Sequence, residues 1–322
     1  MTGAITEFME RHYRHFNARE TLAAARSYRD FVQDGGKMLV SLAGAMSTAE
    51  LGVSLAEMIR HDKVHAISCT AANLEEDLFN LFAHNEYKVI EDWRALSAAD
   101  EVQLQSDGFN RVTDTCIPET VMRHMEQRLT EFWRRESDAG TSKFPYEYFY
   151  EILDQEDLKQ HYQVPIENSW VFAAKEKGLP IVSPGAEDST LGNMFTARVM
   201  DGTVGSHSAL RSGTEQLHML ADWYRAQSQD GPIGFFQIGG GIAGDFAICT
   251  VPMLIQDLQE DIPLWAYFAQ ISDAVTSYGG YSGAVPNEKI TWTKLDQHGP
   301  KFMIQSDATI VAPLIFGYVL GW

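Results

Sequence analysis

Apolar positions along the chain alternate between a helical spacing and the short continuous runs typical of buried strands. Residues 19–33 show helical spacing, and a Gly-Gly pair ends it before an apolar run at 37–43. A polar turn leads into a predicted helix at 49–60 and a second apolar run at 64–68. Strand, helix and strand in this order predict one βαβ unit with two parallel strands.

The same alternation returns later in the chain. Further strands are predicted at 180–183, 234–238, 264–271 and 302–306, and further helices at 213–229, at about 245–258 and at the C-terminus. This order predicts an α/β, Rossmann-like fold, with a mostly parallel sheet and helices on both faces. No repeat or linker interrupts the sequence, so we expect a single domain over 1–322 with an N-terminal helical extension at about 1–34.

Polar and Gly-rich segments follow the predicted strands. In an open parallel sheet, ligands bind beyond the carboxyl ends of the strands, so these segments should converge on one site. They are residues 46–49, 69–76, 184–193, 239–245, 272–283 and 307–308.

Charge and composition narrow the choice of partners. The 322 residues have a net charge of −19, which argues against a nucleic-acid partner because phosphate binding needs clustered Lys and Arg. A cationic ligand fits better, although acidic charge also serves solubility. No apolar run approaches the length of a membrane span and the polar N-terminus does not resemble a signal peptide, so we expect a cytoplasmic protein without membrane contact. Three scattered cysteines and ten scattered histidines predict no metal site.

A glycine cluster at Gly239-Gly-Gly-Ile-Ala-Gly244 follows a predicted strand and opens a predicted helix. This is the Gly-x-Gly-x-x-Gly pattern, in which the backbone approaches a pyrophosphate at a helix N-terminus. The acidic residues about 20 positions further on, Glu260 and Asp261, precede Pro263 and fall at a strand start, not at a strand end. A standard Rossmann site, a glycine turn that touches a cofactor in another way, and a simple turn all remain open.

Residues 288–294 contain the side chains that an amine pocket needs. If this segment is extended or irregular and lies at the sheet edge, Glu288, Ile290, Trp292 and Lys294 share one face. A carboxylate can bind an ammonium group and an indole can cover a methylene chain or a cation. A lysine beside them can be desolvated, which lowers its pKa and makes it nucleophilic. The alternative is a surface strand with one buried Trp.

Three motifs near the C-terminus resemble the active-site block of deoxyhypusine synthases. The motifs are Ser282-Gly-Ala-Val-Pro-Asn-Glu288, Trp292-Thr-Lys294 and Ser306-Asp-Ala308. The family reads approximately Ser-Gly-Ala-x-Pro-Asp-Glu, Trp-Gly-Lys and Ala-Asp-Ala. Further matches, in chain order, are Thr70-Ala-Ala-Asn-Leu-Glu-Glu-Asp77, Asn110-Arg111, Ser183-Pro184, Asp188-Ser-Thr-Leu-Gly192 and Gly239-Gly-Gly241. The chain resembles the bacterial-type, deoxyhypusine synthase-like subgroup.

The resemblance implies an NAD-dependent transferase that moves an aminobutyl-type group from a polyamine to an amine acceptor. In the family reaction, NAD takes a hydride from a carbon beside a secondary amine, and a lysine attacks the imine that results. The group then passes to the acceptor and NADH reduces the product. The resemblance also implies a homotetramer with active sites shared between subunits, and spermidine or putrescine as substrate.

The family's functional residues can be carried over position by position. Lys294 is the catalytic residue, and Glu75, Glu288 and Trp292 contact the amine. The positions expected to contact NAD are Thr70, Ala71, Ala72, Glu76, Asp188, Gly240, Ala274, Asp307 and Ala308.

Several positions depart from the family pattern. The family's Lys-His-His after the triple glycine is Gly244-Asp245-Phe246 here, Asn193 replaces an amine-binding aspartate, and Asp273 replaces a cofactor-side threonine. The family's Asp-Gly-Ser-Asp-Ser loop is here Tyr278-Gly-Gly-Tyr281-Ser282.

One interpretation is that the covalent and redox chemistry is kept while Asp245, Asn193, Tyr278 and Tyr281 rebuild the amine pocket for a small polyamine acceptor, giving a homospermidine-type product. The alternatives are deoxyhypusine synthesis on a protein lysine and an inactive paralogue that binds NAD or a polyamine.

Overall fold

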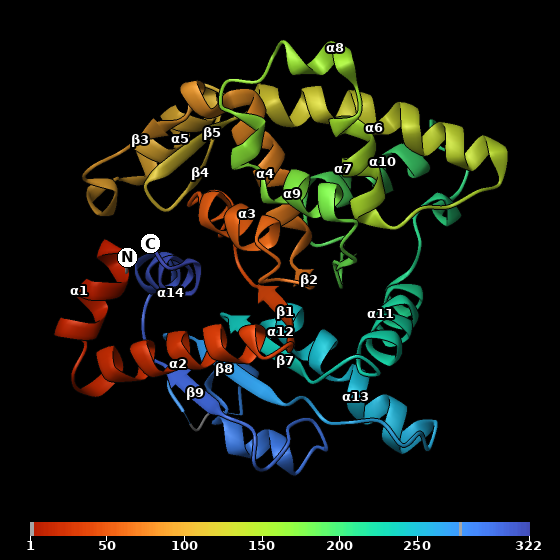
Figure 1. Ribbon diagram of the computed structural model, residues 1–322. Helices are drawn as coiled ribbons and strands as arrows, with labels where there is room; N and C mark the ends of the chain where they lie inside the picture. The colour runs from red at the N-terminus through yellow and green to blue at the C-terminus, as the bar shows by residue number, and fades with distance from the viewer. Residues whose placement is uncertain (1–2, 277–278) are drawn as a thin grey trace.

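A six-stranded sheet forms the centre of the computed structural model, which describes residues 3–276 and 279–322 (Figure 1). The strand order is β6-β2-β1-β7-β8-β9, and each neighbouring pair is parallel. The strands are β1 (Lys37–Leu42), β2 (Ala66–Cys69), β6 (Ile181–Val182), β7 (Ile233–Ile238), β8 (Tyr267–Ile271) and β9 (Lys301–Ile304). Because all six are parallel, their carboxyl ends lie along one edge of the sheet.

Both faces of this sheet are buried. Successive side chains of a strand point to opposite faces, so Val40 and Phe236 contact one hydrophobic core while Leu39 and Phe235 contact the other. A sheet buried on both sides needs apolar residues at nearly every position, which explains the continuous apolar runs in the sequence.

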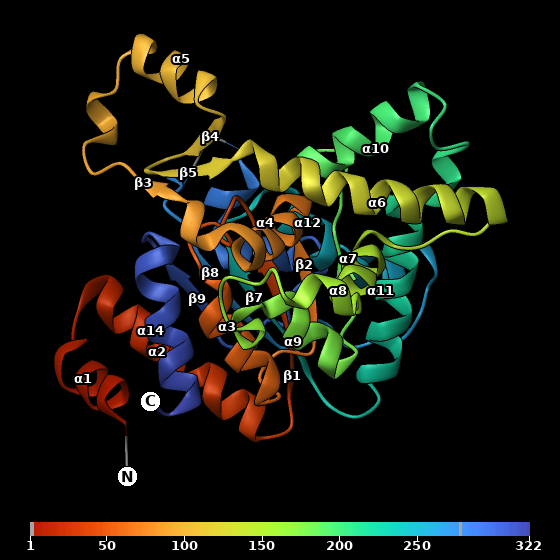
Figure 2. The same ribbon diagram turned by 90° about the horizontal axis from the view of Figure 1, so that it is seen from above.

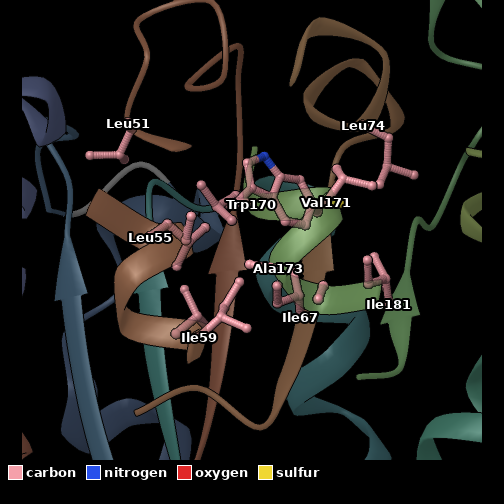
Figure 3. Close-up of a cluster of buried hydrophobic side chains, with 14 of the residues drawn as sticks. Leu51, Leu55, Ile59, Ile67, Leu74, Trp170, Val171, Ala173 and Ile181 are labelled. Carbon is pink, nitrogen blue, oxygen red and sulfur yellow. The ribbon is translucent and has the colours of Figure 1, made fainter. Parts of the chain in front are cut away.

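Helices cover the two faces of the sheet. The rings of Tyr28 in α2 (Phe16–Gln33) and Phe316 in α14 (Ala308–Leu320) both pack against Phe236, so these helices lie on one face. α3 (Gly52–Arg60) and α9 (Trp170–Lys177) pack on the same core, where Figure 3 shows Trp170 among Leu55, Leu74 and Ile67. α11 (Gly213–Gln227) and α12 (Gly241–Ile248) belong to the second core, on the other face. The predicted α/β architecture with helices on both faces is confirmed.

The two ends of the chain meet. α1 (Ala4–His12) is fixed by Thr6, whose backbone N–H donates to the carbonyl of Trp322 at 2.9 Å. α2 packs along α14, and the N- and C-termini lie next to each other in Figure 1. The predicted N-terminal helical segment is therefore two helices that cover the C-terminal helix.

The region between residues 71 and 180 contains most of the structure that the sequence analysis left unassigned. A three-stranded antiparallel sheet of order β3-β5-β4 lies apart from the main sheet (Figure 2). Its strands are β3 (Lys88–Val89), β4 (Phe109–Val112) and β5 (Thr115–Pro118). The helices here are α4 (Ala71–Ala83), α5 (Ala98–Ser106), α6 (Glu119–Ala139), α7 (Pro145–Leu153) and α8 (Glu156–Lys159), and α10 (Thr190–Met200) follows β6.

Several element boundaries differ from the sequence prediction by a few residues. The helix expected at about 245–258 begins earlier, at Gly241, and continues as α13 (Thr250–Pro252) and a π-helical turn at Met253–Asp257. Pro252 provides no backbone N–H, so regular α-helical bonding cannot pass through it. The strand expected at 264–271 begins at Tyr267. Across the described ranges, no helix is both long and apolar enough to cross a membrane.

Candidate active site

A cavity of about 880 Å³ opens beside the second core, between α12 and the loops of residues 279–294. Five of its lining residues belong to the predicted site or adjoin it: Asp245, Tyr281, Glu288, Trp292 and Lys294. Its polar lining also includes Cys249, Gln256, Asp257, Thr276 and Lys289. The cavity thus brings together Asp245 and Lys294, which are 49 positions apart in sequence.

Lys294 and Asp245 form an ion pair in this cavity. The Lys294 Nζ donates to Asp245 Oδ1 at 2.8 Å; the lysine side chain is buried and the aspartate is half-exposed. The same Nζ lies 5.4 Å from the centroid of the Tyr281 ring and 5.9 Å from that of Trp292. The sequence analysis placed Asp245 in the amine pocket without predicting which side chain it contacts. Asp245, which stands where the family has a histidine, provides the carboxylate beside the lysine.

Tyr281 contributes its ring to the cavity, and its hydroxyl group is already bonded. The hydroxyl donates to Gln237 Oε1 at 2.8 Å, and burial holds the pKa of the phenol well above its usual value. A Cβ atom at Gly244 would lie 2.7 Å from that Gln237 oxygen and 3.0 Å from the Tyr281 ring. The change of a family lysine to Gly244 and the presence of Tyr281 are therefore linked, because a side chain at 244 would displace the tyrosine.

The segment that contains Lys294 is not an extended strand, so the period-two alternation that would place alternate side chains on one face is absent. Residues Pro286–Ile290 form a 3-10 helix, and Thr293 has a left-handed backbone with φ of +58°. Ile290 packs against the second core. Glu288, Trp292 and Lys294 still line one cavity, because the helical turn returns them to the same side. Trp292 is 64% exposed, so the alternative of a surface strand with one buried Trp is wrong.

Two residues predicted to contact the amine lie outside this cavity. Glu75 in α4 is buried, and its carboxylate accepts the backbone N–H groups of Thr190 and Leu191 at the start of α10. Burial raises the pKa of Glu75 to about 7, and these two hydrogen bonds oppose that rise. Asn193 is exposed, and its amide donates to the carbonyls of Glu187 and Ser189. Tyr278, the second predicted tyrosine, lies outside the described residues.

The residues predicted to contact NAD lie at or beside the carboxyl ends of the strands. Thr70 to Ala72 follow β2, Gly240 follows β7, and Asp307 and Ala308 follow β9. Glu76 is one turn further along α4, where it accepts the backbone N–H of Thr48 at 3.2 Å, and burial raises its pKa to about 7. Asp188, after β6, and Asp273, after β8, are exposed, and Ala274 is half-buried. The predicted set therefore spans the whole edge.

The glycine cluster lies where the strand order reverses, between β1 and β7. Chain connections run outward from this point in both directions, and such a switch point is where open parallel sheets bind dinucleotides. Gly239 has a φ of +77°, and a Cβ there would lie 2.9 Å from that of Ala43. A Cβ at Gly240 would overlap Ser282, whereas Gly241 is exposed, has a φ of +57° and faces open space. Exposed backbone at a switch point fits the approach of a dinucleotide. The absence of a side chain at Gly240 allows the loop at Ser282 to pack closely against it.

Lys289 is the site residue that sequence reasoning missed. It lies between Glu288 and Ile290, is 2% exposed, and lines the cavity. A lysine in a polar loop has no sequence signal for burial, because long charged side chains normally remain in water. The burial of Lys289 follows from the 3-10 helix at Pro286–Ile290, which directs the side chain inward.

The chain is similar to known proteins over most of its length. Residues 5–319 match the family model described as deoxyhypusine synthase. The chain is 30% identical to a deoxyhypusine synthase-like protein of Nostoc punctiforme over 91% of the chain and 73% of that protein, and 27% identical to one of another Nostoc strain over 99% and 82%. It also shares the fold of a crystal structure assigned as a candidate deoxyhypusine synthase from Entamoeba histolytica, with a TM-score of 0.57, 12% identity, and coverage of 97% of this chain and 91% of that one. The chain therefore belongs to the deoxyhypusine synthase family, a family of transferases.

Proposed function

We propose that this protein is an NAD-using aminoalkyl transferase in which Lys294 forms an imine with an aminobutyl-type group and passes it to a small amine. The observation that supports this most strongly is the environment of Lys294, a buried primary amine paired with Asp245 at 2.8 Å on the wall of a cavity of about 880 Å³. A positioned lysine of this kind is a nucleophile for imine carbons, and it divides one difficult transfer into two easier steps.

Asp245 orients Lys294 and exchanges a proton with it. Lys294 must lose its proton before its lone pair can attack, and the Asp245 carboxylate is within hydrogen-bonding distance of that proton. The aspartate is half-exposed, so the proton can then pass to solvent. NAD, bound along the carboxyl ends of the strands, would accept a hydride from the amine substrate and later return it.

The rest of the cavity fits a short chain with a cationic end. The rings of Tyr281 and Trp292 can cover methylene groups, and Glu288 and Asp257 are exposed carboxylates on the same cavity that can bind a distal ammonium. Because Asp245 and Tyr281 occupy positions at which the family binds its polyamine, we assign a small polyamine acceptor and a homospermidine-type product. A protein lysine is the alternative acceptor.

Self-association completes the proposal. Ile242, Val275, Val285, Trp292 and Ile310 are exposed apolar residues in the loops and helix starts that follow the carboxyl ends of the strands, or in the adjoining segment with Lys294. Glu75 and Asn193 lie outside the cavity of their own chain. A homotetramer with shared sites would cover these apolar side chains and would bring predicted residues from different subunits to one site.

The test is product analysis with the purified protein. We expect that protein incubated with NAD and isotopically labelled spermidine or putrescine, with a panel of amine acceptors, releases a labelled polyamine detectable by mass spectrometry. The Lys294→Ala variant should release none and should keep the wild-type circular dichroism spectrum. Absence of product and of any NADH absorbance with every donor would contradict the proposal. Sedimentation velocity on the same preparation tests the tetramer separately.

A further inference from the structure

Lys289 is a second lysine on the wall of the cavity, and its surroundings differ from those of Lys294. Its side chain is 2% exposed, and its Nζ lies 4.8 Å from the ring centroid of Tyr281 and 5.0 Å from that of Phe268. Within the described ranges, the hydrogen bond found for this Nζ is one donated to the carbonyl of Ala284 at 3.2 Å. An ammonium group has three protons to donate.

Lys301 shows how a structural lysine is satisfied in this protein. Its Nζ donates to three carbonyls, those of Asp296, Gln297 and Gly299, at 2.8, 3.0 and 2.6 Å. All three of its donors are therefore used within the chain. Lys289 is more deeply buried, yet it has one such bond, and its remaining capacity is directed at the cavity that it lines.

Burial favours the neutral form of Lys289. Burial and the positive charge of Lys294 lower the pKa of Lys289 to about 8, while Glu288 and Asp245 oppose this shift. The hydrogen bond from Lys294 Nζ engages Asp245 Oδ1, and the Tyr281 phenol stays neutral because burial raises its pKa. The Nζ of Lys289 therefore loses its proton at a lower pH than an exposed lysine does.

We propose that Lys289 accepts a proton from the amine substrate in the cavity, as a second catalytic residue beside Lys294. This inference rests on the proposed transferase function and adds to it. A substrate amine is an ammonium ion in neutral water and cannot attack a carbon until it loses a proton. Lys289 is buried beside the same tyrosine ring as Lys294, so it is placed to take that proton. It does not compete with Lys294 for the imine carbon.

The step balances within the cavity. The acceptor's N–H bond breaks, its proton goes to the lone pair of Lys289 Nζ, and the acceptor nitrogen keeps the electron pair. That pair forms the new N–C bond to the imine carbon attached to Lys294, and the C=N π electrons move to the Lys294 nitrogen. Lys289 returns this proton to the Lys294 nitrogen and then carries a second proton to it from the acceptor nitrogen. The C–N bond to Lys294 breaks with its electron pair staying on the Lys294 nitrogen, and the acceptor lone pair forms the new C=N bond. No further co-reactant is needed.

The experiment compares pH profiles of turnover. For the wild type, kcat should rise about tenfold per pH unit below about pH 8 and level off above it. Lys289→Met has similar length without a titrating group, and Lys289→Arg stays protonated throughout this range. Both should lose about 100-fold in kcat at pH 8 and should lose the inflection near 8. The control is Lys159→Met, a surface lysine on α8 that should behave as wild type.

Chemical rescue separates proton transfer from a packing role. Small tertiary amines accept protons but cannot be incorporated into the product, so they should restore turnover to Lys289→Ala in proportion to their basicity and should not affect the wild type. Wild-type turnover with an unchanged profile in Lys289→Met, or borohydride trapping of the adduct on Lys289, would overturn the inference while leaving transferase activity established. No turnover by the wild type would instead overturn the proposed function, and this inference with it. Thermal melts identify any variant that fails to fold, and Lys289→Gln then replaces it.

Discussion

Two groups of buried charged residues in this protein use their hydrogen bonds differently. In α4, three consecutive acids accept N–H groups at the starts of other segments: Glu75 from α10, Asp77 from α9, and Glu76 from Thr48. A carboxylate at a helix N-terminus satisfies donors that have no partner within the helix. These acids connect separate parts of the fold.

In the cavity, the side chains of Lys289, Lys294 and Asp245 have fewer hydrogen-bond partners than they could bind. Lys294 has one carboxylate partner, Lys289 has one carbonyl, and Asp245 is half-exposed. Both groups include positions that match the family pattern, so the match alone does not distinguish a residue that builds the fold from one that acts on a substrate. Unused hydrogen-bonding capacity directed at a cavity makes that distinction, and the following predictions test it.

The largest effect should come from Asp245→Asn, which keeps the volume and removes the charge beside Lys294. We expect kcat to fall by about 100-fold, because the amide cannot accept the Lys294 proton. The melting temperature should change little, since Asp245 is half-exposed. Steady-state kinetics and a thermal melt measure the two quantities. An unchanged kcat would show that this ion pair is not part of the reaction.

The α4 acids should instead control stability. Burial raises the pKa of Glu76 from its usual 4.5 to about 7, so between these values the folded state holds a proton that the unfolded state has lost. The contribution of Glu76 to stability is therefore full below about pH 4.5 and decreases as pH rises to about 7. Glu76→Gln should remove about 1 to 3 kcal/mol of this pH dependence, measured by urea unfolding at several pH values. Glu156→Gln, at an exposed site on α8, is the control and should leave the slope unchanged.

Lys289→Met should stabilise the protein at pH 7. The folded pKa of Lys289, about 8, is below the usual 10.5, so between these values the unfolded state holds a proton that the folded state has lost. Because of this group, the free energy of unfolding therefore rises as the pH increases from about 8 to 10.5. Replacing it should increase the free energy of unfolding by about 1 to 2 kcal/mol at pH 7, with the gain disappearing near pH 10.5. A loss of stability at pH 7 would indicate a structural lysine.

The smallest effect should come from Thr293→Gly. A β-branched residue with a φ of +58° is strained, and the family has glycine at this position. Relief of about 1 to 2 kcal/mol, less the backbone entropy of glycine, should leave a net gain of about 0.5 kcal/mol. Thr291→Gly is the matched control, because Thr291 has a φ of −64° and glycine there should destabilise the protein. Equal effects of the two substitutions would contradict the strain argument.

The sequence predicted the parts of this molecule that depend on local pattern. Buried parallel strands and the helices beside them have distinct apolar spacings, so the strands of the main sheet and the edge where the loops meet were predicted correctly. The region from 71 to 180 was not predicted. There, short strands such as β3, with two exposed residues, and α5, whose residues are at most partly buried, have little apolar periodicity.

The sequence predicted which residues belong to the site better than it predicted which of them contact one another. Motifs identified Lys294, Glu288 and Trp292, and the structure brings them to one cavity. The contact between Lys294 and Asp245 joins positions 49 apart and depends on how α12 starts, which no local pattern specifies. The inward turn of Lys289 depends on the 3-10 helix at Pro286–Ile290, which the sequence analysis did not predict.

Covalent trapping on Lys294 tests the central claim most directly. Wild-type protein, NAD and a polyamine donor would be treated with borohydride during turnover, digested and mapped by mass spectrometry. We predict one adduct of aminobutyl mass on the peptide that contains Lys294, none with Lys294→Ala or Lys294→Arg, and none without NAD. An active wild type with no adduct on Lys294, or with turnover retained by both variants, would contradict this mechanism.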